Sequence, residues 1–249
     1  MKKSDTEKAM KYVFDVKERL LHENRFYTED KFRDGLDRII NDECETIEKG
    51  RVFYRARVYN EEDRYNKWHE GVIENDIFKG YNRVESFVNL KNSNAGRGNP
   101  EGISYLYMSS DRETCALEVC SKENVAISIA QIRVNKDLKV VDLSANGYVS
   151  NASEWLTGFK VAISDEINKP ILDTSMGYIF TQYICEYFKR KNIDGVQFNS
   201  TNHSGEMGDD TVGKNLIIFS YDKCEAISSQ LYLSRKVSVE LEEFKQKRE

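Results

Sequence analysis

"GRGNPEGISYLYMSSDRETCALEVC", residues 96–120, combines a loop, a strand and a helix that all carry polar side chains. The stretch opens with glycines on both sides of Arg97, which let the backbone turn tightly and approach a ligand closely. The run from Ile103 to Met108 is strand-like, and Ser110–Asp111 is typical of the start of a helix. This succession indicates a functional segment rather than an ordinary connection.

Upstream of this stretch, the pattern is helical for the first 50 residues and then becomes β-like. Ser4-Asp-Thr-Glu7 has the form of a capping box, and apolar residues then recur at helical spacing in two runs. The second run includes Cys44 and Ile47 and is expected to end with Gly50 as its C-cap. We therefore expect an αα-hairpin. The next run, VFYRARVY, is rich in β-branched and aromatic residues and predicts a strand.

Downstream of the stretch, strand-like and helical patterns follow one another without an internal repeat. Strands are expected at 125–134, 139–143, 195–199, 215–221 and 229–239, and helices at 154–167 and 176–191. Because these strands are separated from a mostly helical start, the pattern favours an α+β fold. We divide the chain into an N-terminal helical hairpin, residues 1–50, and a larger domain, residues 51–249, with a long loop at 60–94.

The composition narrows the classes of function. The 249 residues carry a formal charge of 37 − 42 = −5, which argues against a general nucleic-acid-binding protein. No apolar run is long enough to span a bilayer and no signal peptide is recognisable, so we expect a cytoplasmic protein without a membrane partner. The five cysteines form no CxxC pair and only three histidines are present, which predicts neither a disulfide framework nor a metal site.

Two arginines are candidates for binding an anion. Arg97 lies in the glycine-rich loop, and a guanidinium group suits bidentate contact with phosphate. Arg55 lies in the VFYRARVY strand, where alternation puts it on the same face as Arg57 and opposite Tyr54. An arginine on a mainly buried strand must find an anionic partner or ligand. The alternatives are that Arg97 is solvated and that Arg55 forms a structural salt bridge.

Glu118 and the strand that ends at Ser200 add further polar candidates. Within CALEVC, Glu118 has apolar neighbours that we expect to pack inward, and a carboxylate in such surroundings tends to be paired or functional. DGVQFNST, residues 194–201, predicts a strand that ends at Ser200, where a polar side chain can line a cleft. The alternatives are a helix-surface glutamate and an ordinary turn serine.

Taken in order, these pieces resemble the RES domain family, which is named for an arginine, a glutamate and a serine in its site. The matching motifs are Tyr54-Arg55, Gly96-Arg97-Gly98-Asn99-Pro100-Glu101-Gly102, Leu106-Tyr107-Met108-Ser109, Ala116-Leu117-Glu118, Gln182, residues 194–200 and residues 213–219. The resemblance covers roughly residues 51–225, and its central block is the most specific part. Gly98 departs from the pattern, because an aromatic residue is common there, and it is expected to loosen the loop.

The resemblance implies a fold similar to ADP-ribosyltransferases, with a split, mostly antiparallel β core and helices around it. It also implies that NAD+ is the substrate and that no metal or further cofactor is required. Family members are toxins that degrade NAD+, by hydrolysis or by phosphorolysis with inorganic phosphate, and a neighbouring Xre-type antitoxin holds them in check. We therefore expect an NAD+-cleaving enzyme with such an antitoxin as its partner.

The resemblance also carries expected roles for individual residues. The catalytic candidates are Glu118, Arg55, Tyr107 and Ser200, and the substrate-binding candidates are Arg97, Gly96, Asn99 and Asn215. Cleavage of the nicotinamide–ribose bond passes through an oxocarbenium-like state, whose positive charge the Glu118 carboxylate would stabilise. The two arginines would hold the pyrophosphate or an attacking phosphate. Tyr107 would stack on the nicotinamide or bind a ribose hydroxyl, and Ser200 would orient the ribose or the amide.

Three alternatives stay open at this point. The same residues would serve a transferase that passes ADP-ribose to a protein or nucleic acid, with water or phosphate replaced by a macromolecule. A non-catalytic nucleotide-binding or partner-docking module would keep the pocket without the reaction. The N-terminal hairpin is expected either to pack on the β core or to form a homodimer or antitoxin surface.

Overall fold

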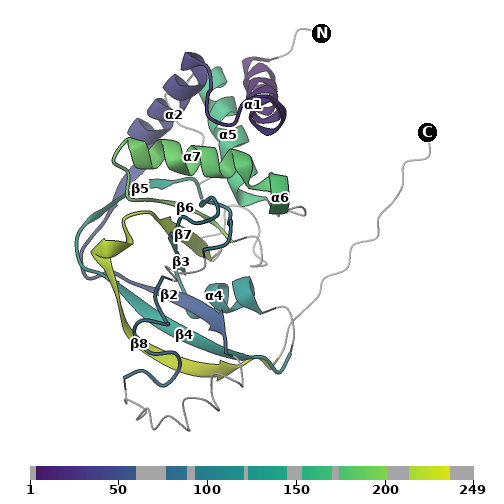
Figure 1. Ribbon diagram of the computed structural model, residues 1–249. Helices are drawn as coiled ribbons and strands as arrows, with labels where there is room; N and C mark the ends of the chain where they lie inside the picture. Colours follow the sequence, from purple (N-terminus) through teal and green to yellow (C-terminus); the bar gives the residue numbers. More distant parts are fainter. Residues whose placement is uncertain are drawn as a thin grey trace, which may run out of the picture.

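The protein, described here by a computed structural model, has helices packed around one mixed sheet (Figure 1). The structure describes residues 4–59, 77–88, 93–120, 123–144, 153–169, 174–200 and 213–235. The helices are α1 (Asp5–His22), α2 (Asp30–Glu43), α4 (Arg112–Val119), α5 (Glu154–Asn168), α6 (Thr174–Gly177), α7 (Ile179–Arg190) and the 3-10 turn η1 (Tyr221–Lys223). The strands are β1 (Cys44–Ile47), β2 (Val52–Val58), β3 (Leu106–Ser109), β4 (Ala126–Val134), β5 (Leu138–Asp142), β6 (Gly195–Asn199), β7 (Lys214–Ile218) and β8 (Cys224–Leu233).

The sheet consists of two halves that meet at one point. Its eight strands run in the order β1-β5-β6-β7-β3-β2-β4-β8, and every neighbouring pair is antiparallel except β5 and β6. The two central strands, β2 and β3, are paired only through Tyr54 and Ser109. Beyond this pair the strands separate, so the sheet opens between Arg55 on β2 and Met108 on β3. The predicted α+β class and the split, mostly antiparallel core are confirmed.

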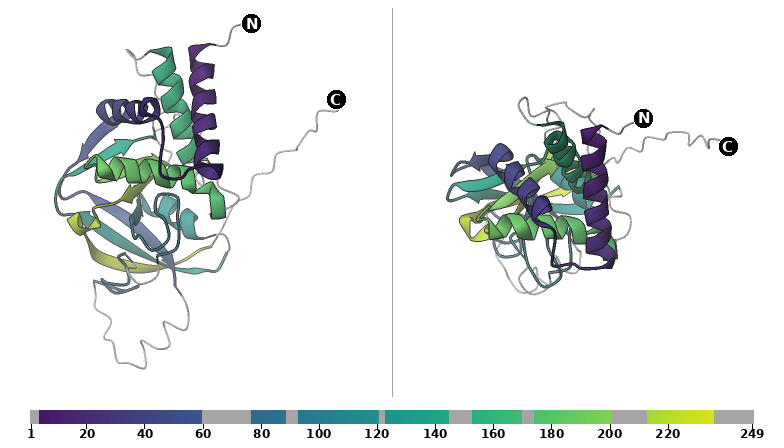
Figure 2. Two further views of the ribbon diagram at one scale, coloured as in Figure 1. Left: turned by 45° about the horizontal axis from the view of Figure 1, so that its top comes forward. Right: turned by 90° about the horizontal axis from the view of Figure 1, so that it is seen from above.

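The N-terminal helices belong to the helical layer over the first half-sheet. Residues of α1, α2, α5 and α7 share one hydrophobic core with side chains of β3, β5, β6 and β7. Figure 2 shows α1 lying alongside α5, and a Cβ on Gly158 of α5 would come within 2.7 Å of the Thr6 backbone. The apolar face of α1 is therefore buried within the chain, which favours packing on the core over a docking surface. None of the helices described is long and apolar enough to cross a membrane.

The second N-terminal helix ends earlier than its apolar pattern predicts. Cys44 and Ile47 do not extend α2, because residues 44–47 form the edge strand β1 and pair with β5. Pairing with residues 44–47 satisfies backbone N–H and C=O groups along the edge of β5, which a further turn of α2 would have left without a strand partner. Gly50 is likewise not a helix cap. With φ of 92°, it forms the turn into β2 and donates its N–H to Val134 O at 2.7 Å. The domain boundary at residue 50 stays a prediction.

Three other boundaries differ from the sequence-based expectations. The strand expected from Ile103 begins at Leu106, because the Ile103 N–H closes a turn on Pro100 O at 3.2 Å. The helix expected over 176–191 is divided at Tyr178 into α6 and α7. Strand β8 begins at Cys224 rather than at 229, and the stretch expected to continue to 239 lies beyond the described residues. Much of the 60–94 loop also lies outside them, although Phe78 bridges to Ser229 of β8.

Candidate active site

A cavity of about 290 Å³ lies where β2 and β3 separate. Its walls come from both half-sheets, from the 96–97 loop, from α4 and from the residue that precedes α7. The lining residues are Tyr54, Arg55, Ala56, Gly96, Arg97, Tyr107, Met108, Ser109, Cys115, Glu118, Val119, Tyr178, Phe198 and Asn215. The cavity is thus located at the gap in the sheet, and six of the eight site residues predicted from the sequence line it.

Glu118 projects from the last turn of α4 and is held by two donors from distant strands. Ser200 Oγ, just after β6, donates to Glu118 Oε1 at 2.6 Å, and Asn215 Nδ2 of β7 donates to the same oxygen at 2.8 Å. Asn215 is itself fixed, because its Oδ1 accepts from Ser109 Oγ at 2.7 Å. Within the part of the chain that the structure describes, Oε2 has no hydrogen-bond partner. The carboxylate is therefore oriented through one oxygen and open at the other.

The surroundings of Glu118 differ from the expectation. The buried face of α4 is formed by Thr114 and Cys115, whereas Glu118 is exposed and Leu117 is only half-buried. Asp111 caps the helix, and its carboxylate accepts from the Thr114 N–H at 2.7 Å. Burial raises the pKa of the Cys115 thiol to about 12, so this cavity residue stays protonated and is not a nucleophile at neutral pH.

The loop at 96–99 is held in place by hydrogen bonds from the side chains of Tyr107, Gln182 and Asn99. Tyr107 donates its hydroxyl to Asn99 Oδ1 at 2.6 Å and accepts the Gly98 N–H at 3.0 Å. Gln182 of α7 donates its side-chain amide to Gly96 O and to Asn99 O, each at 2.9 Å. Tyr107 therefore lines the cavity with its ring, while its hydroxyl belongs to the loop. The buried Asn99 side chain also holds the loop, because its amide donates to backbone carbonyls of the same segment.

Gly98 tightens this loop, which is the opposite of what its departure from the family pattern predicts. A Cβ at this position would lie 2.8 Å from Ile217 Cδ1 and 3.2 Å from Cys185 Sγ. The loop backbone therefore packs directly on β7 and α7. Gly96 is equally confined, since a Cβ there would lie 2.7 Å from the Tyr107 hydroxyl oxygen. Small residues are needed here for close approach within the protein.

Arg55 carries a poorly solvated positive charge in the site. Its Nη1 donates to Tyr107 O at 3.1 Å, which links the two separating strands. Its Nε is buried and has no hydrogen-bond partner among the residues that the structure describes. Burial, reinforced by the neighbouring Arg57, lowers the pKa of Arg55 to about 10. An incompletely paired guanidinium in a cavity is suited to binding an anion, because an anion would restore the solvation that burial removed.

Arg97 joins the loop to the end of α5. Its Nη1 donates to Ile167 O at 2.6 Å and to Lys169 O at 2.9 Å, at the carbonyl end of that helix. Its guanidinium also lies over the Phe198 ring, 5.6 Å from the centroid. Burial lowers the pKa of Arg97, and the nearby Tyr178 and Glu118 oppose this effect. Arg97 is therefore a structural link as well as a cavity residue, rather than a solvated loop side chain.

One protein-family model matches the larger part of the chain. The family model for the RES domain matches residues 78–240. The chain belongs to the RES domain family. Among solved structures, the chain is similar to the crystal structure of the M. tuberculosis MbcT–MbcA toxin–antitoxin complex, with 14% identity, 81% of this chain and 94% of that chain covered, and a TM-score of 0.40. No curated protein matches the chain.

All eight candidate residues of this RES protein come together around the cavity, six in its wall and two, Ser200 and Asn99, one hydrogen bond behind it. Sequence reasoning gave no site role to Ser109, Cys115 or Tyr178, although Ser109 belongs to one of the matching motifs. Ser109 could have been found, because it ends the same short strand as Tyr107. Tyr178 gave no signal, since only the division between α6 and α7 brings it to the cavity.

Proposed function

We propose that this RES domain protein cleaves the nicotinamide–ribose bond of NAD+. The observation that carries the proposal is the grouping of an oriented carboxylate, Glu118, with the incompletely paired guanidinium of Arg55 in one cavity. Family membership supports the choice of NAD+, and it also supports the proposal that the protein acts as a toxin restrained by an Xre-type antitoxin. NAD+ is the substrate, and inorganic phosphate is a candidate co-substrate.

The reaction breaks the bond between the ribose C1 carbon and the nicotinamide nitrogen, and the bonding electron pair leaves with nicotinamide. Positive charge grows on the ribose, where a negative charge held nearby lowers the barrier. Glu118 Oε2 is the oxygen available for this contact, because Oε1 already accepts two hydrogen bonds. Water then gives ADP-ribose and a proton, whereas phosphate gives ADP-ribose phosphate.

Arg55 is the proposed partner of the substrate's negative charge. Its guanidinium lines the cavity and has an Nε that no described residue satisfies, so a phosphate oxygen would add to the existing hydrogen bonds rather than replace one. Arg97 adds positive charge at the same wall, although its Nη1 is committed to α5. The Tyr107 ring and Phe198 offer aromatic surfaces for a planar ring such as nicotinamide.

The test is product analysis with matched variants. Purified protein is incubated with NAD+, with and without inorganic phosphate, and the products are resolved by mass. We expect nicotinamide together with ADP-ribose or its phosphate, and a loss of at least about 100-fold in Glu118→Ala, or roughly 2.7 kcal/mol of transition-state stabilisation. Glu113→Ala is the control, because it removes an exposed carboxylate from the first turn of the same helix.

The same experiment separates the alternatives. Labelled protein or nucleic acid after incubation with NAD+ and cell extract, without free ADP-ribose, would assign the chain to the transferases. If NAD+ stays intact in every reaction, including those with extract, the proposal is wrong and the protein is a non-catalytic binding module. In cells, expression of the unpartnered protein is expected to lower NAD+ and viability, and Glu118→Ala to do neither.

A further inference from the structure

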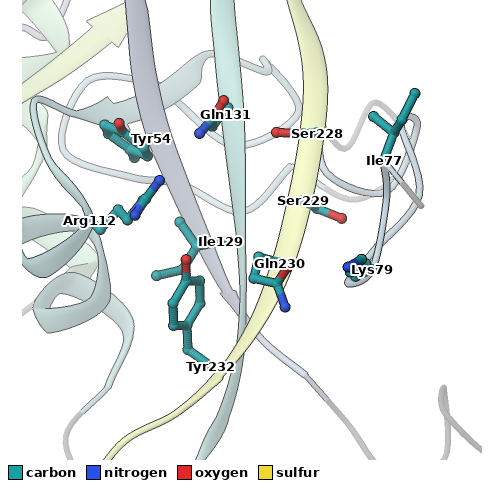
Figure 3. Close-up of a pocket in the computed structure, with 10 residues that line it drawn as sticks. All are labelled: Tyr54, Ile77, Lys79, Arg112, Ile129, Gln131, Ser228, Ser229, Gln230 and Tyr232. Atoms are coloured by element: carbon teal, nitrogen blue, oxygen red, sulfur yellow. The ribbon is translucent and has the colours of Figure 1, made fainter. Parts of the chain in front are cut away.

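A second pocket adjoins the cavity at Tyr54. It has a volume of about 280 Å³ and lies over β4 and β8. Its lining residues are Tyr54, Ile77, Lys79, Arg112, Ile129, Gln131, Ser228, Ser229, Gln230 and Tyr232 (Figure 3). Tyr54 lines both this second pocket and the cavity that contains Glu118, so the two are separated by little more than one side chain.

Strand register explains why polar side chains gather here. Tyr54 is paired with Gln131 of β4, and Gln131 is paired with Ser228 of β8, so the three side chains share one face in a line across the strands. One step along, Ile129 is paired with Gln230. In the described part of the chain, none of the polar side chains in these pairs forms a hydrogen bond within the protein. Their amide and hydroxyl groups are available to a ligand.

The charged side chains described in the second pocket, Arg112 and Lys79, are both cations. Arg112, the first residue of α4, stacks its guanidinium on the Tyr54 ring at 5.4 Å from the centroid. Lys79 belongs to a segment whose backbone is held to β8, since its N–H donates to Ser229 O at 2.9 Å. No carboxylate is among the described residues that line this pocket. Within the residues described, neither Arg112 nor Lys79 forms an ion pair.

The described residues that line this pocket include two cations and a row of amide and hydroxyl donors but no carboxylate, and this combination defines the chemistry of a ligand. A phosphate group has three strong acceptor oxygens and about two negative charges, which such a surface can satisfy together. An arginine stacked on an aromatic ring is already oriented, so little side-chain entropy is lost when it binds. The buried Ile129 provides an apolar floor, which suits an attached sugar or base.

We propose that the second pocket binds the phosphate group of a free phosphate ion or of a nucleotide. In the nucleotide case the inference rests on the proposed function, because the ligand would then be the dinucleotide extending past Tyr54 from the cavity. Neighbouring strands lie about 4.8 Å apart, so the second pocket is one to two strand spacings from β2. A cavity of 290 Å³ is at the lower end for drug-sized ligands, and a dinucleotide would need further room.

The experiment measures binding of three probes to the full chain: inorganic phosphate, ADP and adenosine. Calorimetry gives affinities, and amide chemical shifts at 129–131 and 228–230, compared with 107–109, locate the ligand. Arg112→Gln and Lys79→Gln are each expected to weaken ADP binding about tenfold or more, with adenosine binding weak in every protein. Arg190→Gln, which removes an exposed arginine from the end of α7, is the control and is expected to bind as the wild type does.

The probes separate the two sources of phosphate and separate this inference from the proposed function. Shifts at 129–131 with inorganic phosphate alone indicate a free-ion site, whereas shifts only with ADP indicate a nucleotide site. ADP has no nicotinamide bond, so its binding is independent of whether NAD+ is cleaved. If the dinucleotide spans both pockets, Arg112→Gln raises KM for NAD+ about tenfold with kcat unchanged. Absence of binding at millimolar concentration, or binding unaffected in both pocket variants, overturns the proposal.

Discussion

Ser200 Oγ donates a hydrogen bond of 2.6 Å to Glu118 Oε1 across 82 positions of sequence. The two residues come from different halves of the split sheet, because Ser200 follows β6 while Glu118 lies on the helix that covers β2. Neither half can fix the carboxylate alone. The orientation of Glu118 therefore depends on how the two half-sheets are joined at the Tyr54–Ser109 pair.

Ser200→Ala is expected to act through the position of Glu118. The substitution removes one of two donors to Oε1, so the carboxylate gains freedom while Asn215 still holds it. A misplacement of about 1 Å can cost about 100-fold in rate. We expect kcat for NAD+ cleavage to fall by about 10- to 100-fold with KM nearly unchanged. A rise in KM at constant kcat would instead make Ser200 a substrate-binding residue.

Arg55→Met is expected to raise the stability of the protein and to weaken NAD+ binding. The folded-state pKa of Arg55, about 10, is below its ordinary value, so the charged form is disfavoured by folding and destabilises the protein at every pH below about 10. This penalty decreases as the pH rises from about 10 towards the unfolded-state pKa. At pH 7 we expect Tm to rise by about 2–4 °C, or about 1 kcal/mol.

In the same variant, Arg55→Met, we expect the affinity for NAD+ to fall at least tenfold. Arg57→Met is the matched control on the same strand. Arg57 Nη1 donates to Glu85 O, so its removal is expected to lower Tm and leave NAD+ affinity unchanged. A lower Tm in Arg55→Met would show that the hydrogen bond to Tyr107 O outweighs the cost of burying the charge.

Gly98→Ala tests the close packing of the loop. The added Cβ would lie 2.8 Å from Ile217 Cδ1, so the side chain or the loop must move. Overpacking of this kind costs about 1–3 kcal/mol. We expect a lower Tm and weaker NAD+ cleavage, and partial recovery of both in Gly98→Ala/Ile217→Val, because that change shortens the opposing side chain. No recovery in the double variant would place the strain in the backbone.

Local patterns predicted most of the elements, because each depends on residues close in sequence. Helix α4 begins with an Asp111 cap, and β6 follows a short apolar run that ends in polar residues. The site residues were predicted to form one group because the motifs that carry them occur in the order of the RES family. The spacing of the residues along the chain did not predict this grouping. Three features had no local signal: the separation of β2 from β3, the pairing of Cys44–Ile47 with β5, and the second pocket. Each depends on contacts between segments far apart in the chain.

The Glu43–Lys160 pair is the last test, and it concerns how the N-terminal helices are fixed to the core. Lys160 Nζ of α5 lies 2.5 Å from Glu43 Oε1 of α2, and their side chains are only 5% and 15% exposed. Removing one partner from a buried pair costs about 3–5 kcal/mol, because a buried charge is left alone. We expect Glu43→Ala to lower Tm by roughly 6–20 °C, at about 2–4 °C per kcal/mol.

The double variant Glu43→Leu/Lys160→Met distinguishes a charge effect from lost packing. Both charges are removed and apolar volume is kept, so we expect Tm to return to within a few degrees of the wild type. NAD+ cleavage is expected to be unchanged in the double variant, since neither residue lines the cavity. A Tm as low as that of Glu43→Ala would mean that the contact between α2 and α5 depends on the ion pair itself.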